Sequence, residues 1–551
     1  MRRFLMASGV IFSLLFFSLI FYPLLSRDTK DYTDKKFNSV LQSIDLNYIE
    51  KVDKDKLVED AIKGMLKELD PHSVYISAEE MKGVQEDFQG SFEGIGIQFD
   101  VIDDTITVVH PIPGGPSDKL GILSGDKIVT IDSVSAIGMS RDSIPRKLKG
   151  PKGTVVVVEI KRWNTKDLLR YEIVRDKIPL NSIDAFFIKD GTDIGVIKIN
   201  RFSATTHREM LTALRQLKKQ GMNKLVIDLR YNPGGYLNQA FQMANDFLTY
   251  GDTIVYTMGR RPEFTEYFLS EGGGEYEKIP LIVLVNDGSA SASEIVSGAI
   301  QDLDRGLIVG ETTFGKGVVQ RQYQLEDGSA YRLTISKYYT PSGRCIQRPM
   351  KDESKYRRLV GRFELDEGSY IDDTYNKITK QVEKHNKDIE KEEDKIKIDS
   401  LPLYKTKSGR IVFGGGGITP DVIIKQDTIT PLSVHIRRKN LFFQYVNKYM
   451  IENGERLKKM YENDFTSFLR NFKITENMTN DFKKMVVDEG VEWNDDNYNS
   501  DKDFINISLK STIAKDIWGQ ERSTECFLTT DKQLLRAFEH FPDAVKISKL
   551  R

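Results

Sequence analysis

The spacing of hydrophobic and polar positions changes several times along the chain, and each change predicts a different kind of element. Residues from about 31 to 90 carry apolar side chains at helical spacing, as in KLVEDAIKGMLKEL. From about 91 to 176 the pattern becomes short apolar strands separated by turn signals: GIGIQFDV, TITVVH, KIVTI and TVVVVEIKR. We therefore expect a helical region over 28–90 and a compact β-rich module over 91–176.

Beyond the β-rich module, buried strands alternate with helices. KLVIDLR, LIVLV and GLIVG have the composition of buried strands, and YLNQAFQMANDFL and SEIVSGAIQDL are amphipathic. This alternation predicts an α/β core over 177–350. A densely charged segment, 351–405, is typical of an exposed helical insertion or a partly disordered arm. FGGGGITPDVII returns to the core over 406–430, and 431–551 is mostly helical.

The first residues differ in character from the rest. Phe4 to Leu25 carry no charge, and Arg2 and Arg3 precede them. This is the pattern of a signal or membrane anchor over 1–27, with the arginines inside and the bulk of the chain exported. Because no clear cleavage site follows, an uncleaved anchor is slightly favoured.

Composition removes some classes of function. The formal net charge is −1, so no global field favours nucleic acid. Two cysteines, Cys345 and Cys526, form neither a zinc motif nor a disulfide framework. We expect no metal and no cofactor.

The stretch NDGSASASEI carries three serines between a predicted strand and a predicted helix. Ser289, Ser291 and Ser293 are all candidate nucleophiles, and one helix cap accounts for one of them, not for three. A nucleophile at a helix N-terminus gains from the helix dipole, which favours a developing oxyanion. The pattern alone does not choose among the three.

A serine nucleophile needs a base, and none of the six histidines lies near these serines in the predicted core. The GxSxG elbow is absent, and the Ser-x-x-Lys string at Ser124 falls in a turn of the β-rich module. Lysine remains: Lys316 in TTFGKGVVQRQ has glycines on both sides and apolar neighbours, which suggests a dry pocket. Gln320, four residues on, could hold its amine. A surface lysine in a glycine turn fits the same pattern equally well.

An oxyanion needs amide donors. RYNPGGYL offers Gly235 at a strand end, where no side chain blocks approach, and the residue after the nucleophile is the usual second donor. An ordinary turn is the alternative interpretation of Pro233 to Gly235.

Four long motifs in this order, LRYNPGG, SASASEI, GETTFGKGVVQ and YYTPSGRCIQ, closely resemble the carboxyl-terminal processing peptidases, also called tail-specific proteases. LKELDPHSVYI and FEGIGIQF fit the N-terminal helical part and the PDZ domain of that family. The match is collinear over roughly 35–350 and resumes at GGGGITPDV. It implies a ClpP/crotonase-like α/β core with an inserted PDZ domain, an N-terminal helical region and a mostly helical C-terminal extension.

The family uses a Ser–Lys dyad assisted by a glutamine. The resemblance makes the middle serine, Ser291, the nucleophile, Lys316 the base and Gln320 its helper. The oxyanion donors correspond to the amides of Gly235 and Ala292. Cys345 stands where the family more commonly has serine, so catalysis should not depend on it.

The predicted PDZ module contains a loop resembling the one that captures a peptide carboxylate. GIGI, which is Gly94, Ile95, Gly96 and Ile97, corresponds to this loop, and the two isoleucines would contact the terminal side chain.

Together these features predict an envelope serine endopeptidase that recognises substrate C-termini and cleaves by an acyl-enzyme mechanism, in protein processing or quality control. Expected partners are peptides with free C-termini, an adaptor lipoprotein or a second copy, and the membrane through the N-terminal segment. The expected location is the periplasmic side of the cytoplasmic membrane. Two rival functions are a silent PDZ scaffold and an acyl-CoA enzyme, because strand–Gly-Gly–helix units also suit thioester chemistry.

Overall fold

The computed structural model describes residues 29–163, 165–348 and 403–549, together with a few single positions between 376 and 387. The predicted anchor and nearly all of the charged insertion lie outside these residues. The chain divides into two compact units, one ending at Tyr75 and one beginning at Ile76. No helix in the described ranges is both long and apolar enough to span a bilayer.

The first unit is helical, as predicted. Helix α2 spans Thr29–Asn47 and α3 spans Lys54–Lys67, and the short strand β1 (Val74–Ile76) follows. The Asp53 carboxylate accepts a hydrogen bond from the Lys56 amide at 3.1 Å, which caps α3.

The second unit starts with helix α4 (Ala78–Gln89) and continues into the β-rich module. The module's sheet has the order β3 (Ile97–Ile102), β4 (Thr105–Pro111), β5 (Lys127–Ile131), β7 (Val155–Lys161) and β8 (Leu169–Val174), with β6 (Val134–Ser135) paired to β5. Helices α5 (Pro116–Lys119) and α6 (Ser143–Leu148) complete it. Alternate residues of β7 are fully buried, since side chains in a strand point to opposite faces in turn: Val156, Val158 and Ile160. Strands β2 (Ser91–Gly94) and β9 (Asp176–Pro179) pair where the chain enters and leaves the module.

The α/β core is a six-stranded sheet in the order β10 (Ile183–Ile188), β11 (Ile194–Ile199), β12 (Lys224–Asp228), β15 (Leu281–Val285), β16 (Leu307–Gly310) and β21 (Val422–Ile423). All pairs are parallel except β10 with β11. A parallel sheet is buried on both faces, which explains the continuous apolar runs that the sequence shows here.

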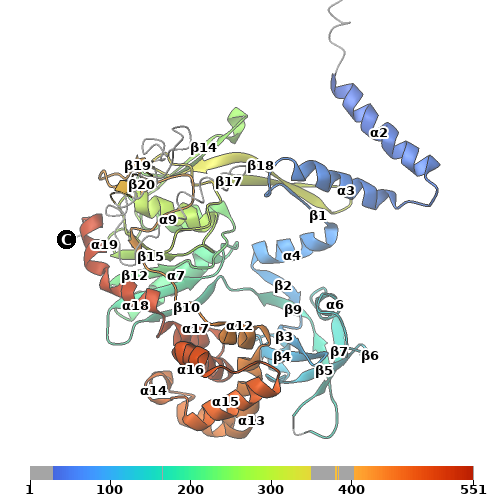
Figure 1. Ribbon diagram of the computed structural model, residues 1–551, viewed down its shortest axis with the longest axis vertical. Helices are drawn as coiled ribbons and strands as arrows, with labels where there is room; N and C mark the ends of the chain where they lie inside the picture. Colours follow the sequence, from blue (N-terminus) through green and yellow to red (C-terminus); the bar gives the residue numbers. More distant parts are fainter. Residues whose placement is uncertain are drawn as a thin grey trace, which may run out of the picture. The chain divides into compact units, whose positions relative to one another are not determined.

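Helices cover both faces of this sheet (Figure 1). Ile197 and Ile227 pack in one hydrophobic cluster with helices α7 (Thr206–Lys219), α8 (Leu237–Asn245) and α9 (Ala292–Asp302). The neighbouring residues Val196 and Val226 face the other way, toward α18 (Lys532–Glu539) and α19 (Phe541–Ser548). The last helices of the chain therefore complete the core.

A second sheet carries the hairpin that follows the predicted base. It contains β13 (Thr253–Gly259), β14 (Glu266–Leu269) and β18 (Ala330–Tyr339), with β17 (Val318–Gln324) paired to β18 and the 3-10 turn η1 (Pro262–Phe264) between β13 and β14. Strands β19 (Leu403–Lys405) and β20 (Ile411–Phe413) form a separate pair.

The rest of the C-terminal extension forms a bundle with its own aromatic core, including Phe442, Phe468 and Phe482. It consists of α12 (Pro431–Arg438), α13 (Leu441–Tyr461), α14 (Phe465–Asn471), α15 (Glu476–Asp488), α16 (Asp495–Trp518) and α17 (Gln520–Leu528). The predicted architecture is confirmed. The helical extension, which the sequence shows as one segment, contributes both to this bundle and to the covering of the core sheet.

Candidate active site

The three serines of NDGSASASEI have different environments. The Ser289 hydroxyl donates to the Leu229 carbonyl at 2.9 Å, and the Ser293 hydroxyl donates to the Asn232 carbonyl at 2.9 Å. Both residues are fully buried, whereas Ser291 is half-buried. Two of the three hydroxyls therefore tie the helix start to the neighbouring strand end, and Ser291 is the one with an accessible side chain.

Ser291 stands immediately before α9 in a strained conformation. Its φ is 54° and its ψ is −110°, a combination that non-glycine residues rarely adopt. Such strain persists only when the surroundings fix it, and it concentrates at functional sites.

A buried carboxylate joins the Ser291 turn to the loop that carries Lys316. Glu294 Oε2 accepts from the Ser291 amide at 2.8 Å and from the Lys316 amide at 2.9 Å. Oε1 accepts from the Gly315 amide at 2.6 Å and from the Thr313 hydroxyl at 2.5 Å. The amide nitrogens of Ser291 and Lys316 therefore lie no further apart than two hydrogen bonds laid end to end. Burial raises the pKa of Glu294, and these hydrogen bonds oppose the rise.

The Gly315–Lys316–Gly317 loop is packed too closely for side chains at its glycines. A Cβ at Gly317 would lie 2.6 Å from the Gln347 amide nitrogen, and Gly315 has a φ of 86°. Burial lowers the pKa of the Lys316 amine, the nearby positive charge of Arg332 lowers it further, and Glu294 raises it. Lys316 is half-buried, and its neighbour Phe314, one of the apolar residues expected to cover it, is exposed.

The Ser291 side chain is not hydrogen-bonded to the Lys316 amine within the part of the chain that the structure describes. Its recorded partner is the phenol of Tyr338, a fully buried residue of β18. The same phenol donates to the Lys316 carbonyl. Tyr338 therefore contacts both members of the predicted dyad. A direct hydrogen bond between a nucleophile and its base often forms only when substrate is bound.

The loop that carries the predicted oxyanion donor Gly235 packs against the turn of Ser291 and Ala292. Gly235 and Phe202 form an isolated parallel β-bridge. In this bridge the Phe202 amide donates to the Gly234 carbonyl, and the Tyr236 amide donates to the Phe202 carbonyl. The Gly235 amide therefore points to the opposite side. A Cβ at Gly234 would lie 2.8 Å from both the Ala292 amide nitrogen and the Ser291 Cβ. Across the described ranges, no acceptor is recorded for the amides of Gly235 and Ala292.

Gln320 lies on β17, directly after a β-bulge between Val319 and Gln320, and pairs with Thr334. Bulges change the direction in which a side chain points.

The GIGI loop connects β2 and β3. Gly96 has a φ of 74°, and the Ile95 carbonyl accepts from the Ser117 amide and hydroxyl. Ile95 is fully buried in the core of the module, and Ile97 is partly buried against that core.

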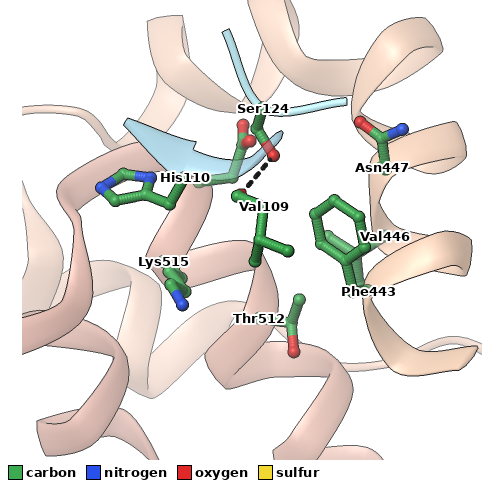
Figure 2. A pocket seen from close by; sticks show the side chains of 9 residues that line it. Val109, His110, Ser124, Phe443, Val446, Asn447, Thr512 and Lys515 are labelled. Atoms are coloured by element: carbon green, nitrogen blue, oxygen red, sulfur yellow. Dashed lines mark hydrogen bonds between the residues drawn. The ribbon is translucent and has the colours of Figure 1, made fainter. Parts of the chain in front are cut away.

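A separate cavity lies between the β-rich module and the C-terminal bundle (Figure 2). Val109 and His110 line it from β4, and Phe443 and Lys515 line it from α13 and α16. None of the predicted site residues lines this cavity.

Sequence reasoning missed Glu294, Thr313 and Tyr338. Glu294 stands three residues after the serine that begins a helix, a spacing that reads as an ordinary helix cap. His207 pairs with Asp246 at 2.9 Å.

Peptidase family S41 matches residues 193–352, a PDZ domain matches 94–173, the N-terminal domain of the activating protease CtpB matches 25–80, and a family of unknown function matches 434–519. The carboxy-terminal-processing protease of Bartonella bacilliformis is 39% identical over 57% of this chain and 72% of its own length. The carboxy-terminal processing protease CtpA of Bacillus subtilis is 38% identical over 59% of this chain and 68% of its own. A solved structure titled photosystem II D1 C-terminal processing protease is 28% identical over 56% of this chain and 89% of its own, with a TM-score of 0.33, too low to add to the sequence matches.

A peptidase core with an inserted PDZ domain defines a PDZ-containing serine peptidase. The chain belongs to the carboxy-terminal processing protease family. The resemblance stated from the motifs is thereby confirmed.

Proposed function

We propose that the protein cleaves peptide bonds by a Ser/Lys acyl-enzyme mechanism. Ser291 is the nucleophile, Lys316 is the base, and the amides of Gly235 and Ala292 bind the oxyanion. Gln320 assists the lysine.

The observation that carries this proposal is the shared Glu294 carboxylate. It holds the turn of Ser291 and the loop of Lys316 through one pair of oxygens, with four donors at 2.5 to 2.9 Å. The hydroxyls of Ser289 and Ser293 are occupied by backbone carbonyls. Of the three serines, Ser291 is the one that is not fully buried, and its amide shares the carboxylate with the lysine loop.

The chemistry follows from the charge state of the lysine. A neutral amine can accept the proton of the Ser291 hydroxyl as the oxygen attacks the scissile carbonyl, and burial favours the neutral form. The oxyanion that forms lies at the start of α9, where free amides and the helix dipole stabilise negative charge. The ammonium of Lys316 then protonates the leaving amine, and the neutral lysine activates a water molecule that releases the acyl group.

The proposal includes recognition of the substrate's C-terminus by the PDZ domain and export of the protein. β3 is an edge strand of the module's sheet, and an edge strand can accept a peptide as an additional strand. Two arginines followed by an uncharged apolar stretch support a location on the outer side of the cytoplasmic membrane, with the N-terminal segment as anchor or cleaved signal. A second copy or an adaptor lipoprotein is a candidate partner.

Mass spectrometry of peptide digests tests the mechanism. The S291A and K316A variants should each lose at least 10³-fold of the parent kcat/KM while keeping the parent melting temperature. K337A is the matched control, because Lys337 is exposed on the same hairpin, and it should cleave at the parent rate. Turnover by K316A near the parent rate would remove the lysine from the role of base. Equal cleavage of peptides with free and amidated C-termini would contradict carboxylate recognition.

A further inference from the structure

The hairpin that follows Lys316 carries a second cationic residue on the face of Gln320. The pairs Gln320 with Thr334 and Gln322 with Arg332 are two residues apart, so these four side chains share one face. Arg332 Nε donates to Gln322 Oε1 at 3.3 Å, which confirms that the two side chains meet. Arg332 is therefore the diagonal neighbour of Gln320, a separation of about 7 Å in an antiparallel pair.

Aromatic rings fix the position of the guanidinium. Arg332 Cζ lies 5.3 Å from the ring centroid of Phe88, at the end of α4. The Phe88 ring meets the Tyr236 ring edge-on at 4.8 Å, and Tyr236 follows the oxyanion residue Gly235. A half-buried positive charge is thus held between the hairpin of the base and the oxyanion loop.

The other titratable and charged groups around the Lys316 loop do not supply this charge. The negative charge of Glu294 raises the pKa of Lys316 instead of lowering it. Burial raises the pKa of Tyr338 well above its usual range, so the phenol is neutral. The Arg348 guanidinium lies over the Phe314 ring and donates to the Thr313 carbonyl. After burial, Arg332 is the main influence lowering the pKa of Lys316.

We propose that Arg332 is a positioning residue whose permanent positive charge, fixed on Phe88 beside Gln320, favours the neutral form of the catalytic amine. The inference rests on the proposed Ser/Lys mechanism. An arginine suits this role because it does not lose its own proton at any pH at which the enzyme works.

The test is the pH dependence of kcat/KM in the full-length protein. Activity requires a neutral lysine, so it rises with pH through the pKa of Lys316. Removing a neighbouring positive charge raises that pKa. In R332Q the acid limb should therefore move up by about one pH unit, with activity about tenfold lower on the limb and near the parent at its high-pH plateau. R332K should retain the parent profile within about 0.3 units.

The matched control is R321Q. Arg321 is the neighbouring residue on β17, its side chain points to the opposite face, and its guanidinium lies over the Phe264 ring at 5.3 Å. This variant loses the same charge from the same hairpin, and its acid limb should not move.

A second measurement separates base ionisation from peptide binding. The rate at which a fluorophosphonate probe labels Ser291 should show the same shift of the acid limb in R332Q. An unshifted limb in both measurements, or a raised KM with an unshifted limb, overturns the inference. If R332Q folds poorly, the comparison of R332K with R332M at a temperature where both are folded decides in the same way. Full activity of K316A would instead refute the mechanism itself, so the two failures are distinguishable.

Discussion

A buried ion pair joins the RYNPGG motif to the start of helix α18. Arg230 Nη1 bonds both carboxylate oxygens of Asp531, at 2.9 and 3.0 Å, and the same guanidinium bonds Asp228. The Arg230 side chain is 6% exposed and the Asp531 side chain 18%. Lys198 completes the network through Asp228, so two positive and two negative charges balance.

We expect the substitution Asp531→Asn to weaken the attachment of α18 and α19 to the core sheet. Removing one partner of a buried pair leaves an uncompensated charge, which typically costs about 3–5 kcal/mol. Two features lower this value. Asp531 is not fully buried, and asparagine keeps the cap of α18, where the Asp531 side chain accepts from the Leu534 amide at 2.7 Å. The expected cost is therefore about 2–3 kcal/mol.

Hydrogen–deuterium exchange of the α18 and α19 amides measures this cost directly. A loss of about 2–3 kcal/mol should accelerate their exchange roughly 30- to 150-fold, because local opening exposes these helices. The control is Lys532→Gln, one residue further on. It breaks an ion pair with Asp427 in which both side chains are more than half exposed, and it should change exchange about twofold or less. Equal exchange in the two variants would refute the account based on a buried charge.

Two other predictions concern the oxyanion loop and the cavity beside the PDZ domain. Gly235→Ala should reduce kcat about 100-fold, because at a φ of 147° the added Cβ would lie 2.1 Å from the Phe202 carbonyl oxygen. The control is Gly221→Ala, which also has a positive φ but open space around the added Cβ, and it should keep the parent kcat. Parent-like kinetics of Gly235→Ala would contradict the assignment of Gly235 as an oxyanion donor. Burial lowers the pKa of Lys515 to about 8, so the unfolded state binds more protons between about pH 8 and 10.5 and the free energy of unfolding rises with pH across that window. Lys515→Met should remove this rise, measured by denaturation at a series of pH values. It should also stabilise the protein at pH 7 by up to about 3 kcal/mol, less the contribution of the hydrogen bond from Lys515 to Gln98. An unchanged slope of the free energy of unfolding against pH would mean that another group titrates.

Much of the fold follows from periodicity. The runs KLVID and LIVLV are buried strands because parallel strands with helices on both faces have no polar side. Which helices cover which face does not follow. Phe538 packs on strands that come more than two hundred residues earlier in the chain, and amphipathic spacing indicates that a face is buried without indicating its partner.

The candidate site, like the fold, was predictable from the sequence only in part. The motifs brought Ser291 and Lys316 forward as candidates, but local sequence cannot distinguish three serines with equal propensities at a helix start. The distinction comes from distant carbonyls, those of Leu229 and Asn232, which take the hydroxyls of Ser289 and Ser293. These partners lie on a strand end that only the folded sheet brings beside the serines.

Glu294, which connects the Ser291 turn with the Lys316 loop, was not predicted, because its sequence signal has a simpler explanation. A glutamate three residues after a helix-initiating serine usually caps that helix, and Glu294 does accept from the Ser291 amide. The Glu294 carboxylate also accepts hydrogen bonds from donors beyond the helix, at Thr313, Gly315 and Lys316. A carboxylate can do this because it has about four acceptor positions, whereas a serine or asparagine cap has fewer. The dense hydrogen bonding also explains how an acid so deeply buried is tolerated, because its two oxygens accept from four donors.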